Sequence, residues 1–376
     1  MAAVYIIADN VFSPIGKTTA QNLELLKAGV SGIKKHHNAK LSDDSFYASL
    51  FVADAFEVNT EYTKFEQLLI ASISNAILDS EIDISDKNTI LIISSTKGNI
   101  GLLETEAYSS DLQKRIALNT SSKLIAEYFG FVNEPIVISN ACISGIMGII
   151  TGMRLIQSGQ FENVIVAGAD VVTKFILSGF QSFQAIGTTP CKPFDINRNG
   201  ISLGEGAATV VLSSKSKNKI DIQVLGGAVS NDANHISAPS RTGAELSWAI
   251  ECTLKQANLL SGDIDFISAH GTATIYNDEM EAKAINLSNL QHTPVNSLKG
   301  YYGHTLGAAG LIESIISIHS LKENRIIPTL GFEEIGVSTP VNVCMELVHG
   351  NYNNCLKTAS GFGGCNAAVA FGKRKV

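Results

Sequence analysis

"NACISGIMGII", residues 140–150, places one cysteine, Cys142, between a short apolar run and a glycine-punctuated helical pattern. The preceding run PIVIS (135–139) is rich in β-branched residues, which is typical of a buried strand. A helix that starts just after Cys142 would direct its unpaired N–H groups and positive dipole end at the sulfur, which lowers the pKa of a thiol. The stretch therefore predicts a candidate nucleophile in a strand-to-helix turn, although most buried cysteines are inert core residues.

The same alternation of short apolar runs and helical patterns continues in both directions and predicts an α/β fold. The chain has the composition of a large core, with 376 residues of which 45% are hydrophobic. Strands are expected at 4–9, 89–95, 135–139, 163–170, 207–214, 222–227, 266–271, 294–298 and 367–372. Further helices are expected to begin near Thr18, Thr242, Asp278 and Thr305.

The polar stretch SKSKNK (214–219) separates two halves, which we predict to be residues 1–215 and 220–376. Each half contains an apolar strand, a turn with a reactive side chain and a glycine-rich helix. The reactive side chain is Cys142 in the first half and His304 in the second. This correspondence predicts an internal duplication.

Charge and cysteine usage exclude several classes of protein. The net charge of -7 and a pI near 5.6 argue against nucleic-acid binding. No uninterrupted apolar run reaches the roughly 18 residues of a membrane span. The six cysteines have no zinc-type spacing, and the first residues carry no secretory pattern. We expect a reduced, cytoplasmic protein with no metal site and no membrane span.

Two of the eight histidines stand where predicted strands meet glycine turns. His270 lies in FISAHGTATIYNDEMEA (266–282), and His304 lies in NSLKGYYGHTLGAAGLIE (296–313) ahead of a helix. Strand ends of this kind are where α/β folds place their chemistry. Either histidine alone is as readily a structural residue, but a cysteine and two histidines in matching settings together predict a catalytic group.

These motifs resemble the β-ketoacyl synthases, the condensing enzymes of fatty-acid and polyketide synthesis. The resemblance extends over nearly the whole chain and implies the thiolase fold, an α/β fold of duplicated αβαβα layered halves. Its blocks are ACISG (141–145), PFDINRNGISLGEGAATVVL (193–212), NDANHISAPS (231–240), AHGTATIYNDEMEA (269–282), LKGYYGHTLGAAG (298–310) and GFGGCNAAVAFG (361–372).

The resemblance implies roles for the candidate residues. Cys142 would accept the acyl chain, and His270 and His304 would face the thioester of the second substrate. Thr272 and Thr274 match hydroxyl residues that hold the phosphopantetheine arm.

The resemblance also implies a supporting set of charged residues. Lys299 matches a family lysine that precedes the second histidine, and Asp278 and Glu281 match acidic positions expected to pair with it as structural support. Glu313 matches the glutamate on the following helix.

The implied chemistry is a decarboxylative Claisen condensation, in which malonyl loses carbon dioxide and the resulting enolate attacks the acyl group on Cys142. Two imidazole N–H donors would stabilise the enolate. The backbone N–H groups of Cys142 and Phe362 would form the oxyanion hole, and Phe362 would also act as an aromatic gate. The histidine at position 304 fits the elongation class, because related initiation enzymes have asparagine there.

Two other functions stay open. A chain-length-factor-like partner subunit resembles these enzymes but lacks the nucleophile, which Cys142 retains. A thiolase would use a second cysteine as base, and Cys365 stands where the family usually has threonine. The departures Asn140, Ile143 and Ile275 from the family pattern predict a reshaped acyl pocket.

The resemblance implies no cofactor, because the substrates travel on the phosphopantetheine of an acyl carrier protein. It implies a homodimer, or a heterodimer with a chain-length-factor homologue. The chain is shorter than typical elongation enzymes between residues 95 and 142 and between 180 and 193, which favours a specialised pathway such as an aryl polyene, pigment or other polyketide system.

Overall fold

A computed structural model describes residues 2–52, 55, 61–218, 220–233 and 235–375. The strands are β1 (Tyr5–Phe12), β2 (Lys34–His36), β3 (Phe46–Ser49), β4 (Thr89–Ser94), β5 (Ile136–Ile138), β6 (Asn163–Asp170), β7 (Leu203–Gly204), β8 (Gly206–Ser213), β9 (Ile220–Asn231), β10 (Phe266–Ser268), β11 (Pro294–Asn296), β12 (Arg325–Ile326), β13 (Asn342–Val343), β14 (Val348–His349), β15 (Asn354–Gly361) and β16 (Cys365–Lys375). The α-helices are α1 (Thr19–Lys27), α2 (Lys64–Ser80), α3 (Ser110–Arg115), α4 (Leu118–Phe129), α5 (Ser144–Gln157), α6 (Lys174–Ser182), α7 (Ala244–Ala257), α8 (Ile275–Leu287), α9 (Lys299–Tyr302) and α10 (Ala309–Glu323). Short 3-10 turns are η1 (Ile100–Glu104), η2 (Ser261–Asp263) and η3 (Leu306–Ala308).

The strand order demonstrates the duplication that the sequence predicts. In the first half the strands lie in the order β5-β4-β6-β8-β1, and in the second in the order β11-β10-β15-β16-β9. If the strands named for each half are numbered in chain order, both halves have the order 3-2-4-5-1 across the sheet. In both, the first two pairings are parallel and the next two are antiparallel. Strands β1 and β9 pair at the junction, so the two halves share one sheet in the described part of the chain.

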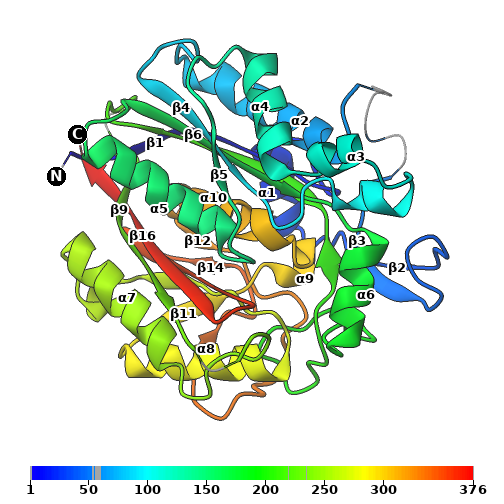
Figure 1. The fold of residues 1–376 in the computed structure, drawn as a ribbon. Helices are drawn as coiled ribbons and strands as arrows, with labels where there is room; N and C mark the ends of the chain where they lie inside the picture. The colour runs from blue at the N-terminus through cyan, green and yellow to red at the C-terminus, as the bar shows by residue number, and fades with distance from the viewer. Residues whose placement is uncertain (1, 53–54, 56–60, 219, 234, 376) are drawn as a thin grey trace.

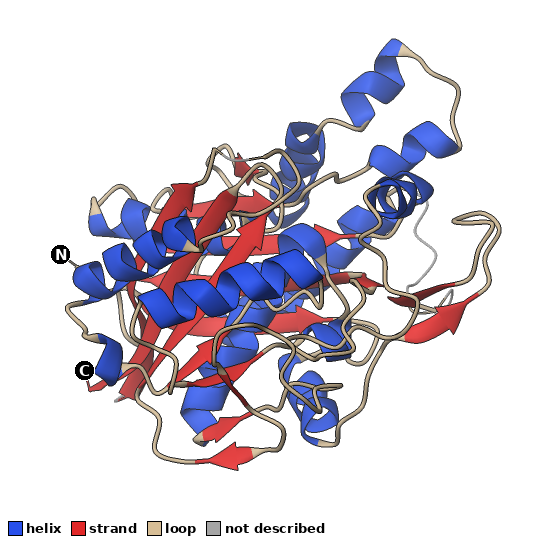
Figure 2. Ribbon diagram, turned by 90° about the horizontal axis from the view of Figure 1, so that it is seen from below, coloured by secondary structure: helices blue, strands red, loops and turns tan. Residues whose placement is uncertain are grey.

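Helices cover the sheet in layers (Figure 1). Helices α5 and α10 lie between the two halves of the sheet, and their apolar residues belong to one central core. Helices α2 and α4 pack on the outer face of the first half, and α7 and α8 on the outer face of the second. The result is the αβαβα layering that the resemblance implies, and Figure 2 shows the strands from a perpendicular direction with helices lying against them.

Burial explains the composition of the central strands. Strand β6 is covered on both faces and is buried from Val164 to Asp170, which suits its continuous apolar sequence. Helix α8 starts at Ile275, three residues before the predicted Asp278, because the Thr274 hydroxyl caps it by accepting the N–H of Asn277. No helix in the described ranges is both long and apolar enough to cross a membrane.

The two central helices approach each other through glycines. A Cβ at Gly145 of α5 would lie 2.8 Å from the backbone nitrogen of Leu311, and a Cβ at Gly310 of α10 would lie 2.8 Å from that of Ile146. Real Cβ atoms do not tolerate such distances, so both positions require glycine. This contact holds the start of α5, which follows Cys142, against the start of α10, which follows His304.

Gly145→Ala is expected to lower the free energy of unfolding by about 1–3 kcal/mol, because the added methyl group meets the α10 backbone. Gly179 of α6 is a matched control, since a Cβ there would meet nothing within 4 Å. Gly179→Ala is expected to be neutral or to stabilise the helix by up to about 1 kcal/mol. Thermal unfolding of both variants measures this; equal melting temperatures would contradict the proposed helix contact.

Candidate active site

The structure brings together the three side chains that the sequence singles out as a catalytic group. The Sγ of Cys142 lies 3.0 Å from Nε2 of His304. The rings of His270 and His304 meet edge to face with their centroids 5.1 Å apart. All three side chains are buried, and one potential ligand atom of each lies within 4.8 Å of the others.

The turn that carries Cys142 is tightly specified. Ala141 adopts a left-handed φ of 44°, and the Ser144 hydroxyl accepts the N–H of Asn140 at 2.8 Å and donates to the carbonyl of Ala141 at 2.6 Å. Helix α5 then begins at Ser144, as the sequence predicts. A turn held in this way presents the sulfur in one orientation at the end of β5.

Burial overrides the predicted effect of the helix on the thiol. The pKa of Cys142 is raised to about 12, first by burial and then by the neighbouring Cys365 thiol. The prediction of a lowered pKa is wrong, because desolvation of the thiolate outweighs the helix dipole in this enclosed position. Burial and the charges of Lys299 and Lys357 lower the pKa of His304 well below its ordinary value. The resting pair is therefore a neutral thiol and a neutral imidazole.

One nitrogen of each imidazole is buried away from the contacts described so far. Among the described groups, Nδ1 of His270 and Nδ1 of His304 are buried without a hydrogen-bond partner. The hydrogen bond made by one nitrogen sets the tautomer of a neutral imidazole, so Nε2 of His304 accepts from the thiol when the ring proton is on Nδ1. Nε2 of His304 can thus accept the thiol proton in one step and donate a hydrogen bond in another.

The structure pairs Lys299 with a different residue from the predicted acids Asp278 and Glu281. Its Nζ donates to the carbonyl of His270 at 2.9 Å and pairs with the carboxylate of Glu313. In the described part of the chain, neither Asp278 nor Glu281 forms an ion pair with it. Both acids lie on α8 and face backbone N–H groups, whereas Glu313 on α10 faces the lysine directly.

Asp278 and Glu281 instead hold the loop that follows β10. Glu281 accepts the N–H groups of His270 and Gly271 at 2.7 and 2.8 Å. Asp278 accepts three further N–H groups and has its pKa raised to about 6 by burial. Those three donors are Phe194, Thr272 and Ala273. Their predicted role as structural support thus takes the form of a backbone cradle for His270.

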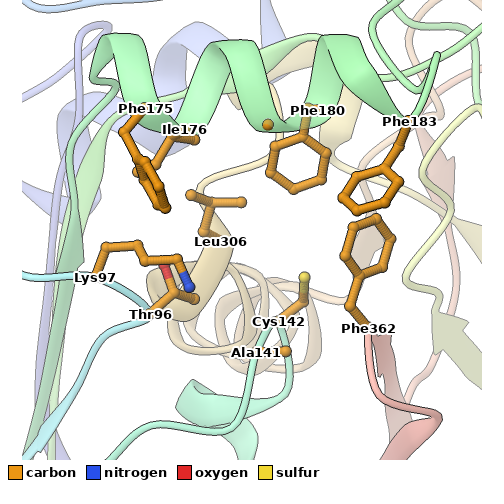
Figure 3. Close-up of a pocket in the computed structure, with 11 residues that line it drawn as sticks. Thr96, Lys97, Ala141, Cys142, Phe175, Ile176, Phe180, Phe183, Leu306 and Phe362 are labelled. Atoms are coloured by element: carbon orange, nitrogen blue, oxygen red, sulfur yellow. The ribbon is translucent and has the colours of Figure 1, made fainter. Parts of the chain in front are cut away.

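A cavity of about 220 Å³ opens beside the sulfur (Figure 3). Phe362 lies beside Cys142, with its ring 5.4 Å from the ring of Phe180 on α6 and 5.4 Å from that of Phe183, which directly follows α6. The lining is Thr96, Lys97, Ala141, Cys142, Phe175, Ile176, Gly179, Phe180, Phe183, Leu306 and Phe362. The backbone of Gly361 also lies against the N–H of Cys142, since a Cβ there would be 3.0 Å from that nitrogen.

Several other sequence candidates lie outside this lining. The hydroxyls of Thr272 and Thr274 are 2.9 Å apart at the start of α8. Ile143 is fully buried in the central core and Ile275 is 60% exposed. Neither of them, nor Asn140, lines the cavity that the structure describes. The expectation that these three departures reshape the acyl pocket stays a prediction.

We assign no metal to the catalytic group. Its three potential ligand atoms lie within 4.8 Å of one another, and the contact between the thiol and the His304 imidazole already accounts for two of them. The absence of a metal stays a prediction.

Two residues of the site were missed at the sequence level. Lys357 of β15 is fully buried and forms an ion pair with Glu313 at 2.6 Å. Its segment NCLKTASG mixes polar and apolar residues, so the sequence alone does not show that this lysine faces inward. Asp170 ends β6 and accepts from Ser95 Oγ at 2.9 Å and from Gly307 N at 2.7 Å. Burial raises its pKa to about 6. It ties the first half of the chain to the segment that follows His304.

Comparison with known proteins gives the class of this architecture. Residues 1–218 match the family described as "Beta-ketoacyl synthase, N-terminal domain", and residues 222–333 match "Beta-ketoacyl synthase, C-terminal domain". The chain belongs to the β-ketoacyl synthase family, has the thiolase fold and carries a Cys-His-His group of the acyltransferase type.

Individual relatives agree along most of their length. The chain is 28% identical to a 3-oxoacyl-[acyl-carrier-protein] synthase 2 of Vibrio cholerae, with 98% of each chain covered. It is 29% identical to a putative mitochondrial 3-oxoacyl-[acyl-carrier-protein] synthase of Schizosaccharomyces pombe, covering 83% of this chain and 82% of that protein. A solved structure, "The ishigamide ketosynthase/chain length factor", superposes with a TM-score of 0.90 at 26% identity, with 99% of each chain covered.

The raised pKa of Cys142 makes a spectroscopic prediction. With a pKa of about 12, only about one thiol in a thousand is ionised at pH 9. The ultraviolet thiolate absorbance of the protein should therefore match that of a Cys142→Ala variant from about pH 7 to about pH 9. A Cys142-dependent signal that saturates near neutral pH would instead indicate a thiolate–imidazolium pair.

Proposed function

We propose that the protein extends an acyl chain held on Cys142 by decarboxylative condensation with a malonyl thioester. The observation that carries the proposal is the 3.0 Å contact of Cys142 Sγ with His304 Nε2, beside a second imidazole from His270. The contact supports transfer of the thiol proton, and the pair of rings supports stabilisation of an anion.

The first step is transfer of the acyl group. As Cys142 Sγ bonds to the acyl carbon, its proton passes to His304 Nε2, and the bond between that carbon and the pantetheine sulfur breaks. His304 returns the proton to the departing sulfur, so the acyl thioester is conserved on the protein. We propose that the backbone N–H groups of Cys142 and Phe362 form the oxyanion hole. They would stabilise the oxyanion in this step and again when the enolate attacks the acyl group.

The second step creates the carbon nucleophile. The carbon–carbon bond to the malonyl carboxylate breaks, carbon dioxide leaves, and the electron pair remains as an enolate on the thioester oxygen. N–H donors of His270 and His304 stabilise that charge in a site from which water is excluded. The enolate carbon then bonds to the acyl carbon on Cys142, the bond between that carbon and the sulfur breaks, and the released thiolate takes up a proton from solvent by way of His304.

The same geometry favours this activity over the two alternatives. A non-catalytic partner subunit would lack the nucleophile, whereas here Cys142 is present and paired with His304. A thiolase would use Cys365 as base, but its Sγ faces the carbonyls of Phe362 and Asn140 at 3.4 and 3.8 Å, and His304 occupies the position beside the nucleophile.

For partners, we infer an acyl carrier protein that delivers both substrates on phosphopantetheine held by Thr272 and Thr274, with no further cofactor. The names of the relatives support the carrier protein. The similarity to the ishigamide ketosynthase/chain length factor supports a heterodimer with a chain-length-factor homologue, and a homodimer is the alternative. A cytoplasmic location is part of the same proposal.

For the pathway, we infer a specialised polyketide system, such as one that makes aryl polyenes or pigments. Phenylalanine side chains at positions 175, 180, 183 and 362 around the cavity support an unsaturated or aromatic acyl chain. Mass spectrometry of Cys142 after incubation with saturated and polyunsaturated acyl carrier substrates decides between this pathway and ordinary fatty-acid elongation.

Cys142→Ala is expected to abolish acyl transfer and condensation, because the variant has no sulfur to hold the chain. Release of carbon dioxide from malonyl thioester should persist, because both imidazoles remain. Intact-protein mass spectrometry and carbon dioxide release measure the two steps separately. Complete loss of decarboxylation in a folded variant would contradict the division of roles.

The two histidines are expected to differ. His270→Ala should lower decarboxylation by about a hundred- to a thousandfold, the usual effect of losing one oxyanion donor, while acylation of Cys142 is largely retained. His304→Ala should lower both steps, because its Nε2 also faces the thiol. Identical losses of both steps in the two variants would show that the assigned roles are wrong.

A further inference from the structure

Lys357 occupies a position where a lysine is costly. Its side chain is 0% exposed, on strand β15, which runs parallel to β10 and places Lys357 opposite Ser268. Its Nζ donates to the carbonyls of Ser268 and Ala269 at 3.2 and 3.1 Å and lies 2.6 Å from Glu313 Oε2. A buried ammonium group persists only when such acceptors replace water.

Lys299 approaches the same strand end from the other side. Its Nζ donates to the carbonyl of His270 at 2.9 Å and pairs with the other oxygen of Glu313. Three successive carbonyls, those of Ser268, Ala269 and His270, therefore accept hydrogen bonds from two ammonium groups. The backbone that positions the His270 ring is held by charge-assisted hydrogen bonds at each of these residues.

The charge of this group depends on Lys357. A lysine paired with one glutamate is neutral overall, whereas two lysines that share Glu313 carry a net positive charge. Nothing in the resemblance or in the assigned roles accounts for the second lysine.

We propose that Lys357 is a positioning residue that converts the Lys299–Glu313 pair into a buried cationic triad, which fixes the end of β10 and adds a positive charge beside the two imidazoles. The inference rests on the proposed function, because the charge acts on the anionic states of that reaction. An added cation favours the enolate and the tetrahedral oxyanion, and it disfavours a second positive charge on either ring.

The directions of the pKa shifts of the His270 and His304 rings agree with this geometry. Burial is the first cause that lowers the pKa of His270, followed by Lys299, His304 and Lys357. For His304 the order is burial, Lys299 and Lys357. The charged groups that act on the two rings are Lys299 and Lys357, and Glu281 accepts the backbone N–H of His270. The Cys142 thiol beside His304 is itself affected by Cys365, Lys299, Asp170 and Glu313.

Removal of the charge tests the proposal. Lys357→Met should raise the pKa of both imidazoles, because a repelling cation is lost. The acid limb of the pH profile for malonyl decarboxylation should then move to higher pH by about one unit, which is about a tenfold loss of rate at a fixed pH on that limb. Lys357→Gln, which keeps a donor for the carbonyls without the charge, should show the same shift.

Two comparisons separate charge from structure. Thr358→Val alters the neighbouring residue of β15, whose hydroxyl donates to Glu281 at 2.7 Å, without changing any charge. Thr358→Val should lower the rate of malonyl decarboxylation without moving the acid limb of its pH profile. Glu313→Gln leaves both lysines uncompensated and should move the limb in the opposite direction, to lower pH. Even if neither Lys357 variant folds, Glu313→Gln still tests whether the charge of this group acts on the rings, because an unmoved limb would contradict that effect.

The resting protein gives a readout that does not need turnover. The pKa of the His270 and His304 rings can be followed by titration of their resonances in nitrogen-labelled protein. It should rise in Lys357→Met and Lys357→Gln, stay unchanged in Thr358→Val and fall in Glu313→Gln. If the wild-type protein fails to decarboxylate malonyl thioester, the proposed function is wrong, whereas these titrations still test the triad. If the wild type is active and Lys357→Met, Lys357→Gln and Thr358→Val share one profile, Lys357 has only a packing role.

Discussion

The close approach of α5 and α10 is the constraint on which the active site depends. Both helices lack a side chain where they meet, at Gly145 and Gly310, and each would meet the backbone of the other if a Cβ were added. Cys142 precedes one helix and His304 precedes the other. The 3.0 Å contact between sulfur and imidazole is thus set by the packing of two helices from different halves of the chain.

The second feature of the site is that its charges lie behind the reacting groups. Cys142, His270 and His304 are neutral in the resting protein, since burial raises the pKa of the thiol and lowers those of the rings. The ions are placed on the supporting residues, where Lys299, Lys357 and Glu313 satisfy one another and the backbone. Charge therefore develops only when a substrate reacts, and the surrounding dipoles are already oriented for it.

The sequence predicted the parts of the structure that depend on local patterns. Nine strands, the turn at Cys142, the helix after it and the duplication follow from periodicity and glycine placement, and the resemblance supplied the roles of the histidines. The strands that were not predicted are β2, β3, β7, β12, β13, β14 and β15. Partners that depend on packing were not predictable in this way. Lys299 was assigned to acids on α8, but Glu313 on α10 lies closer in space; the pKa of Cys142 followed from enclosure, which a helix start does not reveal. Lys357 was missed because no strand was expected at 354–361, and a single lysine in that segment gives no sign that it faces inward.

The duplicated strand order has a consequence for how such a site arises. Two equivalent halves offer the same turn twice, at Cys142 and at His304. If both turns carried the same residue, the centre would contain either two competing nucleophiles or none. Because the two halves are joined in one polypeptide, each turn can change its residue independently of the other. One turn can therefore supply the residue that forms the covalent bond, and the equivalent turn can supply the residue that transfers the proton.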